Sequence, residues 1–184
     1  AAFGIYDKKW RKKVLNKNLI GKEYPPITFK VKKEILIAFS RSTGQIDPIY
    51  FDERKAIDNG HPSIMAPPTF LTVIAMYQEN PYEYLEKINV PLSSVLHAGQ
   101  EYSYFHPIYA DDVIEMKYNI EDIFQRKNGE ITFIVFRSTY TNHNSIKIAE
   151  SASTLAIRWA LKISQSLRSV IRDHHYTSKT FLGW

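Results

Sequence analysis

The sequence predicts a single α+β domain in which a long antiparallel sheet wraps around one buried helix. Residues 95–158 alternate apolar and polar side chains with period two, as β-strands with one buried face do. Residues 69–78 carry apolar side chains on every side of a helix, so this helix must be surrounded by protein. A chain of 184 residues that is 44% hydrophobic is long enough to build one such core.

The first sixty residues predict short elements that precede the buried helix. Trp10, Val14 and Leu15 have the spacing of an amphipathic helix, and Gly21 and Gly44 are the residues expected to end helices. The expected elements are a helix over 7–18, a strand over 27–31, a helix over 32–43 and a loop with one helical turn over 45–60.

The buried helix is expected to begin after two prolines, Pro67 and Pro68, because proline is favoured in the first turn of a helix. Its apolar residues are Phe70, Leu71, Val73, Ile74, Ala75 and Met76. A polar helical stretch over 81–87 follows before the period changes to two.

Four long strands are expected in the second half of the chain. They cover 95–106, 113–124, 131–141 and 146–158. Asn128 and Gly129 lie between the second and third of them, and Asn-Gly is a strong hairpin signal because a type I′ turn needs positive φ at both central residues. We therefore expect these strands to form an antiparallel meander.

A short strand, an all-round apolar helix and four long strands favour the hot-dog arrangement, in which the sheet wraps the helix. One chain would leave a helix face and a sheet edge uncovered, so a dimer is expected. We expect three parts: a basic N-terminal helical arm over 1–20, the hot-dog domain over 21–160 and a C-terminal appendage over 161–184.

The positive charge is concentrated at the N-terminus. Residues 1–20 hold six basic side chains and one acidic one, and the rest of the chain is neutral. This arm could contact a phosphate of coenzyme A, an acidic carrier protein or RNA, but a solvated helix face explains it more simply. Nucleic-acid binding is therefore the weakest of the functional hypotheses.

Several classes of chemistry are excluded by residues that the sequence lacks. There is no cysteine, so disulfides, thiolate nucleophiles and cysteine metal sites are absent. The glycines are too scattered for a phosphate-binding loop, and the histidines lack the spacing of a helical zinc site. No stretch approaches the roughly 18 apolar residues of a membrane span. We expect no metal, no cofactor, no membrane association and a cytoplasmic location.

The segment 42–56 carries a family resemblance. Gly44-Gln45-Ile46-Asp47-Pro48-Ile49-Tyr50, followed by Ala56, resembles the Gly-Asp-x-Asn-Pro-x-His motif of MaoC-like (R)-specific enoyl-thioester hydratases. The helix entry 66–70 and the turn 106–112 are similar to that family as well. The resemblance covers about residues 20 to 158. It is closest to the FAS1-like dehydratase N-terminal domain and to the non-catalytic subunit of heterodimeric (3R)-hydroxyacyl-thioester dehydratases.

The chain departs from this family at the positions that carry catalysis. The resemblance places the catalytic aspartate at Gln45, the catalytic histidine at Tyr50 and the glycine whose N–H binds the oxyanion at Pro68. An amide is not a base near neutral pH, a phenol titrates near about 10, and proline has no N–H. Asp47 with His61 or His97 could form a replacement pair, although Asp47 before a proline is also an ordinary turn residue.

Two functional hypotheses follow from this resemblance. In the first, the chain is a non-catalytic subunit that binds the acyl thioester of coenzyme A or of a carrier protein and becomes active with a catalytic hot-dog partner. In the second, it is a homodimeric hydratase or thioesterase that uses Asp47 with a histidine. Phe70, Ile74 and Tyr77 are the candidates for an acyl-contacting wall, although core packing explains the same pattern.

Overall fold

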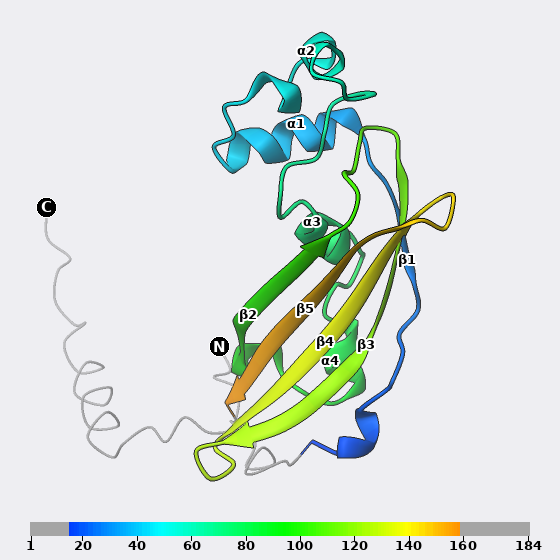
Figure 1. The fold of residues 1–184 in the computed structure, drawn as a ribbon. Coiled ribbons are helices and arrows are strands. Elements are labelled where there is room, and N and C mark those ends of the chain that lie inside the picture. The colour runs from blue at the N-terminus through cyan, green and yellow to red at the C-terminus, as the bar shows by residue number, and fades with distance from the viewer. Residues whose placement is uncertain (1–14, 159–184) are drawn as a thin grey trace, which may run out of the picture.

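The computed structural model describes residues 15–158, and its framework is one antiparallel sheet of five strands (Figure 1). The strands are β1 (Ile27–Lys30), β2 (Val95–Tyr104), β3 (Val113–Arg126), β4 (Ile131–Asn142) and β5 (Lys147–Arg158). They lie in the order β1-β3-β4-β5-β2. The predicted strand boundaries are confirmed to within about two residues, and buried positions alternate along most of β4 and the first half of β3.

The expectation of a four-strand meander is wrong at β2. This strand pairs with β5, not with β3, which follows it in sequence. The connection from β2 to β3 crosses the end of the sheet and is held there by backbone bonds. Asp111 N–H donates to the carbonyl of Val31, and Ala110 N–H donates to the carbonyl of Ile64. A connection of eight residues is long enough to cross, and alternation alone does not specify strand neighbours.

The hairpin between β3 and β4 is confirmed. Lys127, Asn128 and Gly129 all have positive φ, at 51°, 52° and 83°. The left-handed stretch therefore begins at Lys127, one residue before the predicted Asn-Gly pair.

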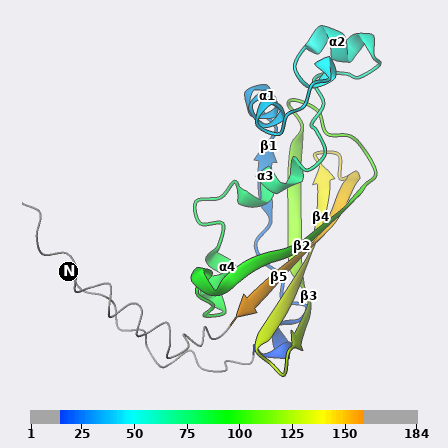
Figure 2. The same ribbon diagram turned by 90° about the vertical axis from the view of Figure 1, so that its left-hand side faces the viewer.

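The central helix α3 (Leu71–Met76) is shorter than the predicted helix over 69–78. It lies with α4 (Glu83–Lys87) on one side of the sheet (Figure 2). Phe70, Leu71 and Ile74 are buried, but Thr72 and Met76 are exposed, so this chain alone leaves one face of the helix uncovered, as the sequence predicts. The reason is geometric: the sheet of a single chain covers one side of the helix and leaves the other open.

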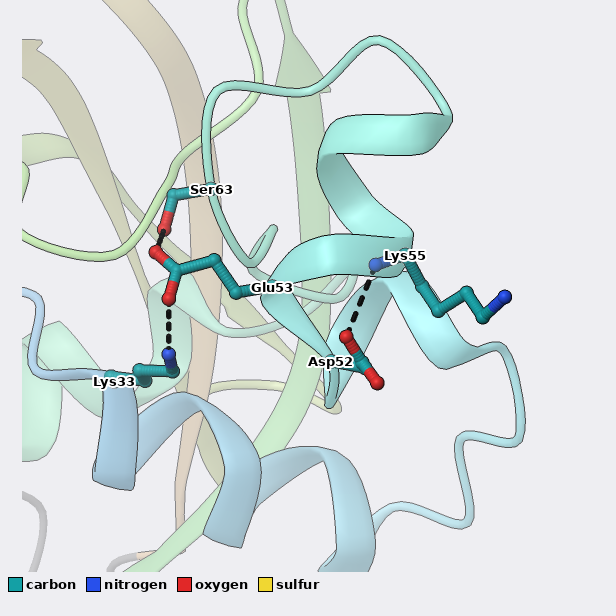
Figure 3. Close-up of polar contacts among 5 residues, drawn as sticks. All are labelled: Lys33, Asp52, Glu53, Lys55 and Ser63. Atoms are coloured by element: carbon teal, nitrogen blue, oxygen red, sulfur yellow. Dashed lines mark hydrogen bonds and ion pairs between the residues drawn. The ribbon is translucent and has the colours of Figure 1, made fainter.

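A helical lobe at one end of the sheet holds the motif that resembles the hydratase family. It contains α1 (Lys33–Ser42), the 3₁₀ turn η3 (Pro48–Tyr50) and α2 (Glu53–Asp58). Glu53 links α2 to α1 and to the segment that follows α2. It accepts hydrogen bonds from Lys33 Nζ at 2.5 Å and from Ser63 Oγ at 3.2 Å (Figure 3). These contacts lower the pKa of the Glu53 carboxyl, the bond from Lys33 having the largest effect. Asp52 caps α2 by accepting from Lys55 N–H at 3.1 Å.

Two hydrophobic clusters make up the core of the described residues. The first lies under α1 and α3 and includes Phe29, Phe70 and Tyr140. The second lies under α4 and includes Leu85, Ile120 and Phe136. Tyr118 is half-buried and packs against both clusters. The concave face of the sheet therefore carries two apolar regions.

Only residues 15–20 of the predicted N-terminal arm lie in the described part of the chain, and there the arm packs against the domain. Residues 7–14 of the expected helix and the whole appendage over 161–184 lie outside the described residues. Lys17–Leu19 form a 3₁₀ turn, η2, and Leu15 is buried in the second cluster. No helix within residues 15–158 has the length and apolarity needed to cross a membrane.

Candidate functional site

Two of the three predicted family positions meet in one cavity at the start of α3. This helix-entry cavity has a volume of about 320 Å³ and is lined mainly by apolar side chains. Tyr50 reaches it from η3, Pro68 and Phe70 from the helix start, and Tyr104 and His106 from the end of β2. Gln45 is not among its lining residues, and no carboxylate from residues 15–158 lines it.

Tyr50 is held as a neutral phenol in this cavity. Its side chain is partly buried, and this burial raises the pKa of the phenol above its ordinary value of 10.0, with a further contribution from the negative charge of Asp47. A phenol with a raised pKa gives up its proton less readily near neutral pH, so Tyr50 is a poor general base.

Asp47 serves a local structural purpose. Its carboxylate accepts a hydrogen bond from Ile49 N–H at 3.1 Å and so caps η3. His61 instead contacts the Tyr109 hydroxyl at 3.3 Å, and His97 contacts Gln100 at 3.3 Å on β2. The structure therefore does not bring Asp47 into hydrogen-bond contact with either histidine that could have completed a replacement pair.

Thr69, which follows Pro68 at the helix entry, has an unusual backbone conformation. Thr69 has φ 74°, in the left-handed region that glycine adopts most readily. Its N–H donates to the Tyr104 hydroxyl at 3.0 Å. Two residues of this chain could therefore correspond to the family's glycine. The sequence pattern assigns that position to Pro68, and the backbone conformation assigns it to Thr69. Of these two, only Thr69 has an N–H.

Thr69→Gly is expected to raise the free energy of unfolding by about 1 kcal/mol. A non-glycine residue in a sparsely populated backbone region stores roughly 1–3 kcal/mol of strain, which exceeds the roughly 0.5–1 kcal/mol that glycine loses in chain entropy. The melting temperature should rise by about 2–4 °C. Ala75→Gly, inside α3, is the control: it should lower the melting temperature, because glycine is unfavourable in the interior of a helix. A lower melting temperature for Thr69→Gly would show that Thr69 is unstrained.

A larger cavity lies between α3, the segment that follows it and the concave face of the sheet. This sheet cavity has a volume of about 660 Å³. Thr72 and Met76 line it from α3, and Tyr102, Ser138 and Ser151 line it from β2, β4 and β5. Its volume lies within the range of about 300–1,000 Å³ typical of small-molecule sites.

The three residues proposed as an acyl-contacting wall occupy different environments. Ile74 is fully buried in the first cluster, and Phe70 is buried there while also lining the helix-entry cavity. Tyr77 is 56% exposed and packs edge-to-face on Phe29 at 4.8 Å between ring centroids. The face of α3 that lines the sheet cavity carries Thr72, Ala75 and Met76 instead.

Comparison with known proteins identifies the family. The model of the FAS1-like dehydratase domain region matches residues 18–151, most of the chain. The chain belongs to this dehydratase family. A relative described as a UPF0336 protein, from Saccharopolyspora erythraea, is 28% identical over 145 residues, which cover 78% of this chain and 92% of that protein.

Solved structures show that this FAS1-like dehydratase domain has the hot-dog fold, as the sequence predicts. One is the C-terminally truncated HadBC (3R-hydroxyacyl-ACP dehydratase) complex from Mycobacterium tuberculosis, with TM-score 0.61 and 25% identity over 72% of this chain and 92% of that chain. Another is the ChsH1-ChsH2 complex from the same organism, with TM-score 0.57 and 16% identity over 76% of this chain and 98% of that chain.

Sequence reasoning did not identify several residues of the dehydratase domain's two cavities. Thr69 and Tyr104 form the backbone contact at the helix entry, and Ser138 and Ser151 line the sheet cavity. A small polar residue at an inward strand position is the signal that marks Ser138 and Ser151 in the sequence. Within residues 15–158, no group of three or more histidine, aspartate and glutamate side chains lies close enough to bind a metal ion.

Proposed function

We propose that this chain is the non-catalytic, acyl-binding subunit of a cytoplasmic (3R)-hydroxyacyl-CoA or hydroxyacyl-carrier-protein dehydratase. Such a dehydratase works only when a second hot-dog subunit supplies the acid and the base. The observation that carries the proposal is the helix-entry cavity: Tyr50 and Pro68 line it where the family has catalytic groups, and no carboxylate of the described part of the chain lines it. Removal of a proton from the acyl α-carbon requires a base within hydrogen-bond reach.

The sheet edge supports a hot-dog partner. β2 is ten residues long and pairs only with β5 among the described strands. Leu96 and Tyr104 on this strand, with Phe105 just after it, are about half exposed or more. A long edge strand with exposed apolar side chains is normally covered by another chain. HadBC and ChsH1-ChsH2, which share the fold, are both complexes.

Reconstitution tests the proposal. The full chain is co-expressed with a hot-dog subunit from the same source that carries the intact Gly-Asp-x-Asn-Pro-x-His motif, and hydration of crotonyl-CoA is followed for the complex and for each chain alone. We expect the complex to exceed the background rate by at least about a hundredfold, the scale of one general base, and this chain alone to remain at background.

Activity of this chain alone would contradict the proposal. It would favour the homodimeric hydratase instead, and Asp47→Asn would then be the first variant to examine. A complex that forms but stays at the background rate would also contradict the proposed role. Light scattering of the mixture shows whether the two subunits have assembled.

A further inference from the structure

The concave face of the sheet carries a row of hydroxyl groups between its two apolar clusters. Tyr118, Ser138, Ser151 and Tyr102 are direct neighbours across β3, β4, β5 and β2. All four line the sheet cavity. We call them the hydroxyl row.

On β3 and β4 the residues on both sides of this row belong to the core. Two positions along the strand in one direction lie Met116 and Tyr140 of the first cluster, with Ala149 of the same cluster on β5. Two positions in the other direction lie Ile120 and Phe136 of the second cluster, whereas β5 carries Ser153 there. Successive inward positions of a strand normally continue one apolar core. Here the serines interrupt it, and because they are small they leave room for the cavity.

The hydroxyls in and beside the row are incompletely satisfied by their neighbours. The Tyr102 hydroxyl makes a short contact of 2.6 Å with Thr72 Oγ1, whereas the Tyr140 and Ser151 hydroxyls are 3.3 Å apart and Ser153 Oγ lies 3.4 Å from His97 Nε2. Hydroxyl pairs usually approach to about 2.5–3.0 Å, and each hydroxyl can donate once and accept twice. Burial raises the pKa of Tyr102, of Tyr118 and of Tyr140, the last to about 12. These phenols therefore stay protonated and able to donate.

The lining also restricts the charge of an occupant. Within residues 15–158 no lysine, arginine, aspartate or glutamate lines the sheet cavity, and His97 is its one basic side chain. A phosphate or another charged group would be desolvated there without a counter-charge, which is unfavourable. The occupant that fits is uncharged and apolar toward both clusters, with an oxygen where it passes the hydroxyl row.

We propose that the sheet cavity binds an acyl chain that carries a hydroxyl or keto oxygen in its interior, and that the hydroxyl row selects this oxygenated chain over a plain alkyl chain. The assignment of the ligand as an acyl chain rests on the proposed function. The preference for an interior oxygen rests on the lining alone. A plain alkyl chain offers these hydroxyls no partner beyond Thr72 and one another, whereas an oxygen in the chain can add a hydrogen bond worth roughly 0.5–1.5 kcal/mol.

The test compares two free acids, and a third as a control, on the purified full chain by isothermal titration calorimetry below their micelle concentrations. The probes are stearic acid and hydroxystearic acid with its hydroxyl at mid-chain. We expect the hydroxylated acid to bind at least about tenfold more tightly, the equivalent of one satisfied hydrogen bond. The isomer with its hydroxyl next to the carboxylate should bind like stearic acid, because that oxygen does not reach the row.

Substitutions locate the preference. The double variant Ser138→Ala with Ser151→Ala should bind both acids within about twofold of each other, since the row loses two of its hydroxyls. Tyr102→Phe, which keeps its ring, should weaken the preference without depending on the folding of the double variant. Ser103→Ala is the matched control, because Ser103 is exposed on β2 and does not line the cavity.

Equal binding of the two acids by the unaltered chain would overturn this inference, and so would a preference that survives both the double variant and Tyr102→Phe. These measurements need neither the thioester nor the catalytic partner. If reconstitution fails but the chain still prefers the hydroxylated acid, only the proposed dehydratase role is contradicted. If the complex is active but the chain shows no such preference, only the proposed selection of an oxygenated chain is contradicted.

Discussion

A dehydratase complex that contains this chain is expected to keep its rate within about twofold when Tyr50→Phe or Asp47→Asn is introduced. The same complex should lose at least about a hundredfold when the aspartate of the partner's motif is changed to asparagine, because that carboxylate is the general base. The difference follows from the site: Tyr50 is a phenol whose pKa is raised by burial, and Asp47 is committed to capping η3. Initial rates with crotonyl-CoA measure both effects.

His61→Ala and His97→Ala complete this comparison. Neither histidine contacts Asp47: His61 contacts Tyr109, and His97 contacts Gln100 and Ser153. Neither variant should therefore show the hundredfold loss of a missing general base, and His97→Ala is expected to act only through acyl binding, because His97 lines the sheet cavity. A loss of a hundredfold or so with Asp47→Asn and with one of these two variants would establish a replacement pair in this chain and would contradict its non-catalytic role.

Phe70→Ala is expected to lower the free energy of unfolding by about 3–5 kcal/mol. Phe70 is 1% exposed, and its ring packs edge-to-face on Phe39 at 5.5 Å and on Phe29 at 6.1 Å between centroids. Removal of the ring leaves a cavity at the junction of α1, α3 and β1, which the surrounding elements can fill only in part. Urea unfolding at a fixed protein concentration measures the change, since association with a second chain also contributes to stability.

Tyr77→Ala is the matched control for this substitution. Tyr77 also contacts Phe29 but is 56% exposed, so its loss should cost about 0.5–1.5 kcal/mol, the value of an aromatic pair. If Phe70→Ala costs no more than Tyr77→Ala, then Phe70 is not a core residue. It would then be better explained as a wall of the helix-entry cavity with little effect on stability.

The local sequence pattern determined the elements of this domain. Alternation located four long strands, the proline pair located the entry to α3, and the motif from Gly44 to Tyr50 identified the family. These features depend on residues that are close in sequence. Side-chain period, turn residues and the absent N–H of proline act over a few positions, so they can be inferred without knowledge of the rest of the chain.

The tertiary structure decided the strand order and the composition of the two cavities. Alternation is satisfied whether β2 lies beside β3 or β5, and the backbone bonds of the crossing connection select β5. The positive φ of Thr69 has no sequence signal, because threonine rarely adopts it. Ser138, Ser151 and Tyr102 come from three strands and form one row because of the register between them. Register is a long-range property, and no local pattern in any one of these strands contains it.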